Sequence, residues 1–221
     1  TDSGIVVTVR TADAWTTTFG VGVATSGSQS VIDLSLQESN LLGTRTVALL
    51  PNRNDTDRSS IAAGFDTPRA IADRIGVGAS IVERSDGRSI TASLRLPFLS
   101  LSSRRGASLV AAASEGRVLQ FRGSTVVDSI WRESALLRAD AAYAVVASPR
   151  GYVRVGVLGQ LLRDDMVAMV DRDDIPQTRT ATAGPYVTIR APRYIRAYNV
   201  ERIGRVEDID IGAFATFAVL A

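Results

Sequence analysis

From Trp15 to the last residue, apolar and polar side chains alternate in successive short segments, and nothing between these segments is long enough to be a helix. A period of two residues is the period of a β-strand, whose side chains point to opposite faces in turn. The segment from Ser89 to Leu96 shows this best, and its apolar face is made by Ile90, Ala92, Leu94 and Leu96. The sequence therefore predicts an all-β protein whose strands each have one apolar and one polar face.

The predicted strands are numerous and are separated by residues that favour turns. Such residues stand in Ser85-Asp86-Gly87-Arg88, in Ser114-Glu115-Gly116 and in Ser148-Pro149-Arg150-Gly151. Strand-like segments lie near residues 4–10, 14–24, 30–37, 44–50, 59–66, 75–84, 88–98, 105–113, 116–122, 124–132, 135–147, 150–163, 184–191, 194–203 and 208–220. We expect about a dozen or more strands, paired as antiparallel hairpins within a single domain over residues 1–221.

The apolar faces have two possible directions, because a soluble barrel points them inward and an outer-membrane barrel points them at lipid. Periodicity alone does not decide between the two. Several segments alternate over about 9 to 11 residues, which is the length of a tilted transmembrane strand. Longer polar connections at 51–58, 66–74 and 163–184 alternate with short turns, as in outer-membrane barrels. We therefore expect an antiparallel up-and-down transmembrane β-barrel, complete or in part.

Glycines and aromatic residues also fit the wall of a barrel. Gly20 and Gly22 share one strand face, and so do Gly76 and Gly78, which suits a tightly curved inner wall. Aromatic residues stand near the ends of predicted strands, where membrane barrels place their interfacial girdles. These residues are Trp15, Phe98, Trp131, Tyr152, Tyr186 and Tyr194. Core aromatics that close the ends of a soluble sandwich are the alternative interpretation.

The composition excludes several classes of function. The chain has no His and no Cys, which excludes Ser-His-Asp and Cys-His catalysis, thiol chemistry and the usual imidazole metal site. All 25 basic residues are Arg, scattered among acidic residues, so no basic stripe predicts nucleic-acid binding. No apolar run approaches the roughly 20 residues of a membrane helix. We expect no enzymatic activity, no cofactor, and no catalytic, cofactor-binding or metal residues.

The densest acidic cluster lies in one predicted connection and consists of Asp164, Asp165, Asp171, Asp173 and Asp174. Carboxylates are calcium ligands, but the EF-hand spacing fails because Pro176 stands where that loop requires Gly. We interpret the cluster as part of a solvated external loop and expect residues 164–182 to form it.

Charged residues also occur on the polar faces of the predicted strands. They include Arg95, Arg138, Asp140, Arg154 and Arg190. In a membrane barrel these side chains would line the lumen, where Arg pairs with carboxylates on neighbouring strands. In a soluble sandwich the same side chains would face solvent.

A succession of short motifs resembles a known family. Asn40-Leu41-Leu42-Gly43-Thr44-Arg45 lies between two predicted strands, and Gly64-Phe65-Asp66-Thr67-Pro68-Arg69, Ser85-Asp86-Gly87-Arg88 and Leu96-Pro97-Phe98 follow it. This order resembles the barrel of the Omp85 superfamily of BamA-like surface antigens, in which a similar turn, strand end and Pro-Phe pair recur early in the barrel. The segment from Val206 to Gly212 is also similar to a strand start in that group.

The resemblance implies a protein of the bacterial outer membrane that helps insert or translocate other outer-membrane proteins. In such barrels a weakly closed seam between the first and last strands can template an incoming strand. The implied partners are outer-membrane lipid and unfolded outer-membrane protein clients, with no nucleic acid. The family's barrels have about sixteen strands and usually follow periplasmic domains, so we expect a fragment that lacks those domains and the final strands.

Two departures limit the comparison. The chain ends at Ala221 without a terminal aromatic residue, and Pro149-Arg150-Gly151-Tyr152, which is similar to an Arg-Gly-aromatic motif of the family, sits in a short hairpin. No role is therefore transferred to Arg150. Two alternatives stay open. A passive porin or surface barrel would conduct without a partner, and a soluble all-β binding module would purify without detergent.

Overall fold

The computed structural model describes residues 8, 15–26, 29–123, 125–168, 177–198 and 206–221, and every regular element in them is a β-strand. The strands are β1 (Thr17–Ser26), β2 (Gln29–Leu41), β3 (Thr46–Asn54), β4 (Ser59–Ile71), β5 (Ile75–Arg84), β6 (Gly87–Leu96), β7 (Arg105–Arg122), β8 (Thr125–Ser148), β9 (Gly151–Ala168), β10 (Thr178–Ala191), β11 (Tyr194–Tyr198), β12 (Val206–Asp210) and β13 (Ala213–Ala218). The predicted strand near 4–10 lies outside the described residues, apart from Thr8.

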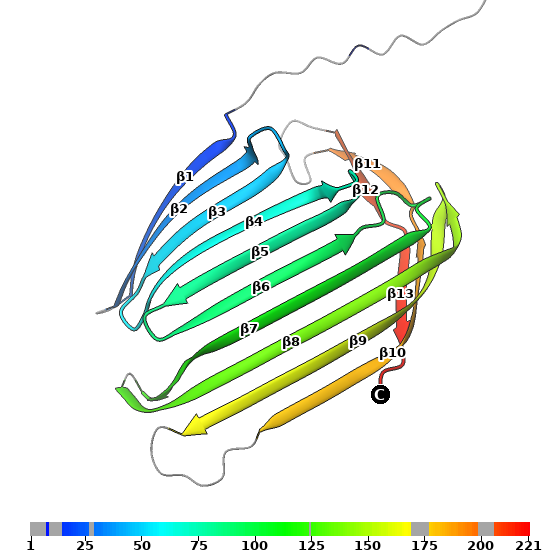
Figure 1. Ribbon diagram of the computed structural model, residues 1–221. Coiled ribbons are helices and arrows are strands. Elements are labelled where there is room, and N and C mark those ends of the chain that lie inside the picture. The colour runs from blue at the N-terminus through cyan, green and yellow to red at the C-terminus, as the bar shows by residue number, and fades with distance from the viewer. Residues whose placement is uncertain (1–7, 9–14, 27–28, 124, 169–176, 199–205) are drawn as a thin grey trace, which may run out of the picture.

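One large sheet holds eleven of these strands in the order β1 to β10 followed by β13, and β11 and β12 form a separate pair. Every pairing is antiparallel, and strands adjacent in the sequence from β1 to β10 are adjacent in the sheet. The predicted antiparallel up-and-down arrangement is confirmed (Figure 1). Within the described residues β1 pairs only with β2 and β13 only with β10, so the sheet is curved but open.

Several predicted turns and loops are strand in the structure. Ser114-Glu115-Gly116, predicted as a turn, lies inside β7 and pairs in register with Arg132 to Ser134 of β8. Gly116 serves a close approach there: a Cβ on it would lie 3.1 Å from the carbonyl oxygen of Asp86, in the turn before β6. Parts of the connections expected at 51–58, 66–74 and 163–184 are also strand, namely residues 51–54, 66–71, 163–168 and 178–184. In the last of these, Thr and Ala residues continue the ladder of β10 with β9.

The turn between β2 and β3 is built by the motif that begins at Asn40. The Asn40 side-chain oxygen accepts a hydrogen bond from the backbone N–H of Arg45 at 2.8 Å. Leu42, Gly43 and Arg45 have positive φ angles of 52°, 74° and 61°. Glycine adopts such angles without steric cost, and the turn is held closed by the Asn side chain, as in other Asn-initiated turns.

The last two pairs of strands form one long hairpin with a bend. Ala191 pairs with Ala213 and Tyr194 pairs with Asp210, so the register continues from β10 and β13 into β11 and β12. Pro192, which has no N–H to donate, interrupts the first arm. Gly212 interrupts the second, where a Cβ would lie 2.2 Å from the carbonyl oxygen of Ala191. Pro192 and Gly212 therefore suit a bend in which the two arms of the hairpin approach each other closely.

The sheet has almost no buried core. Among the described residues, Ala144 and Tyr152 are the only buried hydrophobic side chains. The accessible surface is 16116 Å² for a chain of 23.5 kDa. A compact soluble protein of this mass exposes about 9,800 Å² by the usual scaling. The exposure of large hydrophobic residues along the strands, such as Val21, Leu50 and Val157, shows that their apolar faces are not packed against a second described layer.

Candidate functional site on the two faces of the sheet

Strand register assigns the two faces of the sheet. Leu94 of β6 stands opposite Leu109 of β7, and Leu137 of β8 stands opposite Leu161 of β9, all on one face. The same face carries further exposed apolar residues, which are Phe19, Val21, Val23, Ile32, Leu34, Leu36, Leu50, Ile61, Phe65, Ile81, Ile90, Val155, Val157, Ile189 and Phe217, and the half-buried Val187. An apolar face thus runs without interruption from β1 to β13.

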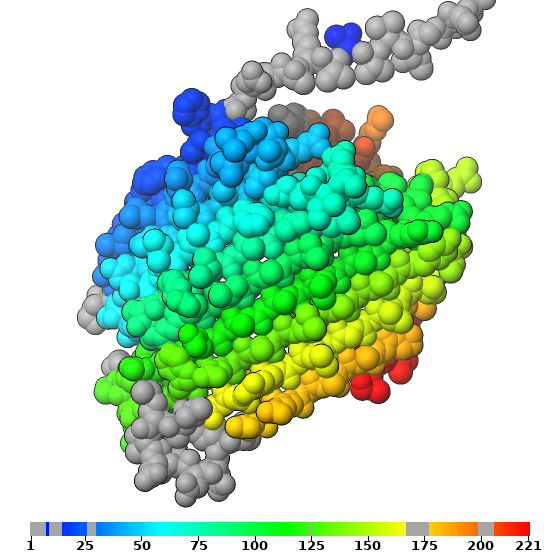
Figure 2. Space-filling view, in the orientation of Figure 1, coloured from blue at the N-terminus to red at the C-terminus, as the bar shows by residue number. Residues whose placement is uncertain are grey.

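This apolar face is the convex side of the sheet. Figure 2 looks onto it, and the side chains of successive strands form one surface that no other described element crosses. Ile90 and Leu94 are 46% and 44% exposed. Contiguous exposed apolar patches on soluble monomers seldom exceed a few hundred Å². The predicted face of Ile90, Leu94 and Leu96 is therefore an outer surface rather than a core between two sheets.

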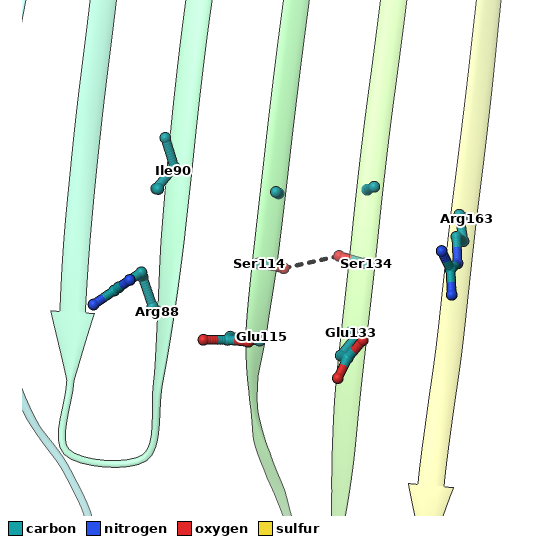
Figure 3. A pocket seen from close by; sticks show the side chains of 9 residues that line it. Arg88, Ile90, Ser114, Glu115, Glu133, Ser134 and Arg163 are labelled. Carbon is teal, nitrogen blue, oxygen red and sulfur yellow. Dashed lines mark hydrogen bonds between the residues drawn. The ribbon is translucent and has the colours of Figure 1, made fainter.

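A row of charged residues ends the apolar face on one side. Register places Glu83, Arg88, Glu115, Glu133 and Asp165 directly opposite one another across β5 to β9. Figure 3 shows part of this row beside a shallow depression of about 340 Å³, whose apolar floor includes Ile90. The Nε atom of Arg88 donates to Glu83 at 2.5 Å, and the guanidinium of Arg163 pairs with Asp165.

The row gives the apolar face a defined height. On β7 the apolar-face residues between Arg105 and Glu115 are Ala107, Leu109, Ala111 and Ala113. Ten residues of strand extend about 33 Å, and a strand tilted by about 40° spans about 25 Å along the axis of a barrel. About 25 Å is the height of the apolar band on outer-membrane barrels.

The opposite face is polar and concave. Arg95 of β6 pairs with Asp66 of β4 across the intervening strand β5. That contact passes over Gly78, where a Cβ would lie 2.8 Å from an Asp66 carboxylate oxygen. Side chains from strands that are not neighbours meet only on the inside of a curve. The glycine pair Gly76 and Gly78, predicted to lie on a curved inner wall, occupies this face.

Ion pairs on the concave face join neighbouring strands. Arg132 donates two hydrogen bonds to Asp164, at 2.7 and 2.6 Å, and Arg53 lies 3.7 Å from Asp33. By register the charged side chains of this face on β2 to β10 are Arg53, Arg84, Arg95, Arg122, Arg132, Arg138, Arg154, Arg190, Asp33, Asp66, Asp128, Asp140 and Asp164. The predicted placement of Arg95, Arg138, Asp140, Arg154 and Arg190 on one polar face is confirmed.

The contacts of these five charged residues are more varied than the predicted ladder of ion pairs. Asp140 accepts a hydrogen bond from the Ser108 hydroxyl, and Arg190 donates to Asp210 of β12 at 2.6 Å. Arg138 is exposed, and no ion pair of its guanidinium occurs among the described residues. Its partners directly across the strands are the uncharged Val110 and Gln160.

Arg154 is held by aromatic rings, a contact that the sequence pattern does not reveal. Its guanidinium lies 3.6 Å from the ring centre of Phe98 and 3.5 Å from that of Tyr152. Phe98 belongs to the connection between β6 and β7 and reaches β9 across the concave face. Gly106 makes room for it, because a Cβ there would lie 2.2 Å from the Phe98 ring.

The interfacial girdle predicted for these aromatics is wrong in three of its members. Phe98 and Tyr152 stack on Arg154, and Tyr186 lies over Gly156, where a Cβ would be 2.6 Å from its ring. All three occupy the concave face. Proximity to a strand end does not fix the face of a side chain, and here Gly106 and Gly156 leave room on the concave face for the rings of Phe98 and Tyr186.

The acidic cluster is divided by the structure. Asp164 and Asp165 lie in β9 and pair with Arg132 and Arg163, so the loop predicted at 164–182 is wrong at both of its ends. Asp171, Asp173 and Asp174 lie outside the described residues. No group of three or more potential metal ligands occurs within the described part of the chain.

Comparison of the chain with models of known protein families finds no match, and comparison with curated protein sequences finds none either. In the described residues, no helix is long and apolar enough to cross a membrane.

Proposed function

We propose that the chain forms the wall of a β-barrel in the bacterial outer membrane and assists the assembly or insertion of other outer-membrane proteins. The observation that carries the membrane assignment is the uncovered apolar convex face, backed by a polar concave face. Water would make such a face costly, at about 25 cal/mol for each Å² of apolar surface. Lipid removes that cost, and the charged row at Glu115 and Glu133 then lies where the strands leave the hydrocarbon.

The role in assembly is supported by the two edges of the sheet, β1 and β13, each of which pairs with only one strand in the described part of the chain. Thr16 accepts a backbone hydrogen bond from Ser39 of β2, so by the alternation of antiparallel ladders the odd-numbered residues of β1 direct their N–H and C=O groups away from β2. Phe19, Val21 and Val23 thus present unpaired backbone groups at this edge. An unpaired edge within lipid is costly, so it favours the addition of an incoming strand.

The experiment is to refold the protein into phospholipid vesicles and to measure how fast an unfolded outer-membrane barrel protein then inserts. We expect faster insertion than into empty vesicles. Val21→Pro removes one edge N–H without removing a hydrogen bond to β2, and it should abolish most of the acceleration. Val21→Ala keeps the N–H and should retain it. Acceleration that Val21→Pro leaves intact would contradict strand templating at this edge.

A passive barrel is the second candidate function, and one observation favours it. The concave face carries arginines that pair with no carboxylate among the described residues, as the lining of a water-filled channel would. In that case the protein would conduct ions in vesicles and leave client insertion unchanged. A soluble binding module is disfavoured, because no described element covers the apolar face.

A further inference from the structure

We propose that the concave face of the sheet lines a path for small inorganic anions and that Arg138 is the residue that selects them. This inference rests on the proposed membrane barrel, since only a sheet whose convex face meets lipid leaves its concave face to water. To the proposed barrel it adds the class of solute that passes through the lumen, which is small inorganic anions.

The first step is the balance of charge on the concave face. Arg53, Arg95 and Arg132 are each neutralised by an aspartate on a nearby strand. Arg190 is neutralised by Asp210. The two remaining aspartates, Asp128 and Asp140, accept hydrogen bonds from the Ser129 backbone N–H and the Ser108 hydroxyl and keep their negative charges. The concave face of β2 to β10 thus has eight arginines against five aspartates, with Asp210 of β12 as a sixth carboxylate.

Four concave-face arginines, which are Arg84, Arg122, Arg138 and Arg154, then have no carboxylate partner among the described contacts. Arg84 donates to the Ser89 hydroxyl at 3.5 Å, and Arg154 is enclosed between two aromatic rings. The concave face therefore carries an excess of positive charge. A channel lined by one sign of charge concentrates ions of the opposite sign.

The second step is the position of Arg138 near the middle of the wall. Its partners across the neighbouring strands, Val110 and Gln160, are uncharged. The row continues through Thr182 on one side and through Ser93 and Gly78 to Asp66 on the other, and Asp66 is paired with Arg95. The Arg138 side chain is exposed on this face. Asp140 follows two residues later on the same face of β8, but no ion pair joins it to Arg138 among the described residues. The exposed guanidinium is therefore open to a passing ion, whereas Arg154 is covered by Phe98 and Tyr152.

The third step is the contrast with the convex face. There the row at the end of the apolar band contains Glu83, Glu115, Glu133 and Asp165, opposed by Arg88 and Arg163. The chain as a whole has a formal charge of only +2. Positive charge is thus concentrated on the concave side of the sheet rather than spread evenly over the molecule.

The test is a measurement of reversal potential across a planar bilayer that contains the refolded protein, under a tenfold gradient of potassium chloride. We expect chloride to permeate better than potassium, with a preference that weakens as ionic strength rises because salt screens the charge. Arg138→Gln should lower the permeability ratio of chloride to potassium by roughly twofold or more, and Arg138→Glu should reverse the preference. Arg138→Lys should keep it, which separates the effect of charge from an effect on folding.

Arg179→Gln is the matched control. Arg179 is an exposed arginine of β10 that stands opposite Arg163 on the convex face, so its loss should leave the permeability ratio unchanged. A cation preference in the unmodified protein, or a ratio that Arg138→Gln does not change, would overturn the inference. Insertion into vesicles without any ion current would also overturn it and leave the membrane barrel standing. Failure to insert at all would overturn the proposed barrel, and this inference with it.

Discussion

The guanidinium of Arg95 in β6 pairs with the carboxylate of Asp66 in β4, two strands away, across the space that Gly78 leaves in β5. This contact ties three strands together on the concave face. It also requires a residue without a side chain at position 78, because a Cβ there would lie 2.8 Å from Asp66 and 3.0 Å from the Ser93 hydroxyl.

Gly78→Val should therefore destabilise the sheet. Overpacking of this kind costs about 1 to 3 kcal/mol, and the substitution also separates the ion pair. Gly159→Ala is the matched control, since Gly159 lies in β9 and a Cβ there has no atom within 4 Å. Urea unfolding of the refolded protein in lipid measures both. Equal midpoints for the two variants would contradict the role assigned to Gly78.

The assignment of the two faces predicts different effects for neighbouring substitutions in β6. Leu94→Arg places a cation on the convex face, where lipid contact near the midplane of a bilayer costs about 2 to 4 kcal/mol. Ser93→Arg places the same cation on the concave face, where it stays hydrated. The free energy of unfolding from vesicles should fall much more for Leu94→Arg. Equal losses would show that the convex face does not meet lipid.

The stack on Arg154 predicts that Phe98 fixes the connection between β6 and β7 to the concave face. Phe98→Ala should destabilise this contact by about 1 to 2 kcal/mol, the range for a desolvated cation and ring. Trypsin should then cleave after Arg104 or Arg105 faster than in the unmodified protein. Leu99→Ala, a substitution of an exposed neighbour in the same connection, should leave the cleavage rate unchanged. Cleavage that is equally fast in both variants would contradict the anchoring role.

Asp210 predicts acid sensitivity of the bend between β10 and β11. Its carboxylate accepts hydrogen bonds from Arg190 at 2.6 Å and from the backbone N–H groups of Gly212 and Arg193 at 2.8 and 3.0 Å. These contacts, the Arg190 side chain first, lower the pKa of Asp210 below its usual value of 3.8. A carboxyl whose pKa is lowered by folding adds stability that is present above pH 3.8 and is lost as the pH falls through the lower, folded pKa.

The measurement is amide hydrogen exchange in β11 and β12 over a pH series, corrected for the intrinsic exchange rates. Asp210→Asn should reduce protection at neutral pH, and the difference from the unmodified protein should vanish in acid. Asp208→Asn is the control, because Asp208 is exposed and lies 3.8 Å from Arg196. A difference between Asp210→Asn and the unmodified protein that persists at the lowest pH would show that the charge of Asp210 is not what holds the bend.

Alternation of apolar and polar residues was enough to predict the strands, their antiparallel order and the residues that share a face. Ser85 to Arg88 and Ser148 to Gly151 were recognised as turns because their residues favour turn geometry in any context. Ser114 to Gly116 has the same chemistry and yet continues β7, because its glycine accommodates the backbone of the turn before β6. Local preference therefore failed where a contact distant in sequence determined the backbone.

The sequence by itself determined that the chain is a meander of two-faced strands, since a period of two requires only neighbouring residues. The tertiary structure decided which face is concave and what meets there. Arg95 and Asp66 come together over Gly78, and Phe98 reaches Arg154, because the curvature of the sheet brings side chains from separate strands to one side. Curvature depends on register and on glycines distributed over many strands, so it cannot be predicted from any single segment of the sequence. Which concave-face arginines lack a carboxylate partner among the described residues was likewise visible only in the tertiary structure, because pairs such as Arg95 with Asp66 join strands that are separate in sequence.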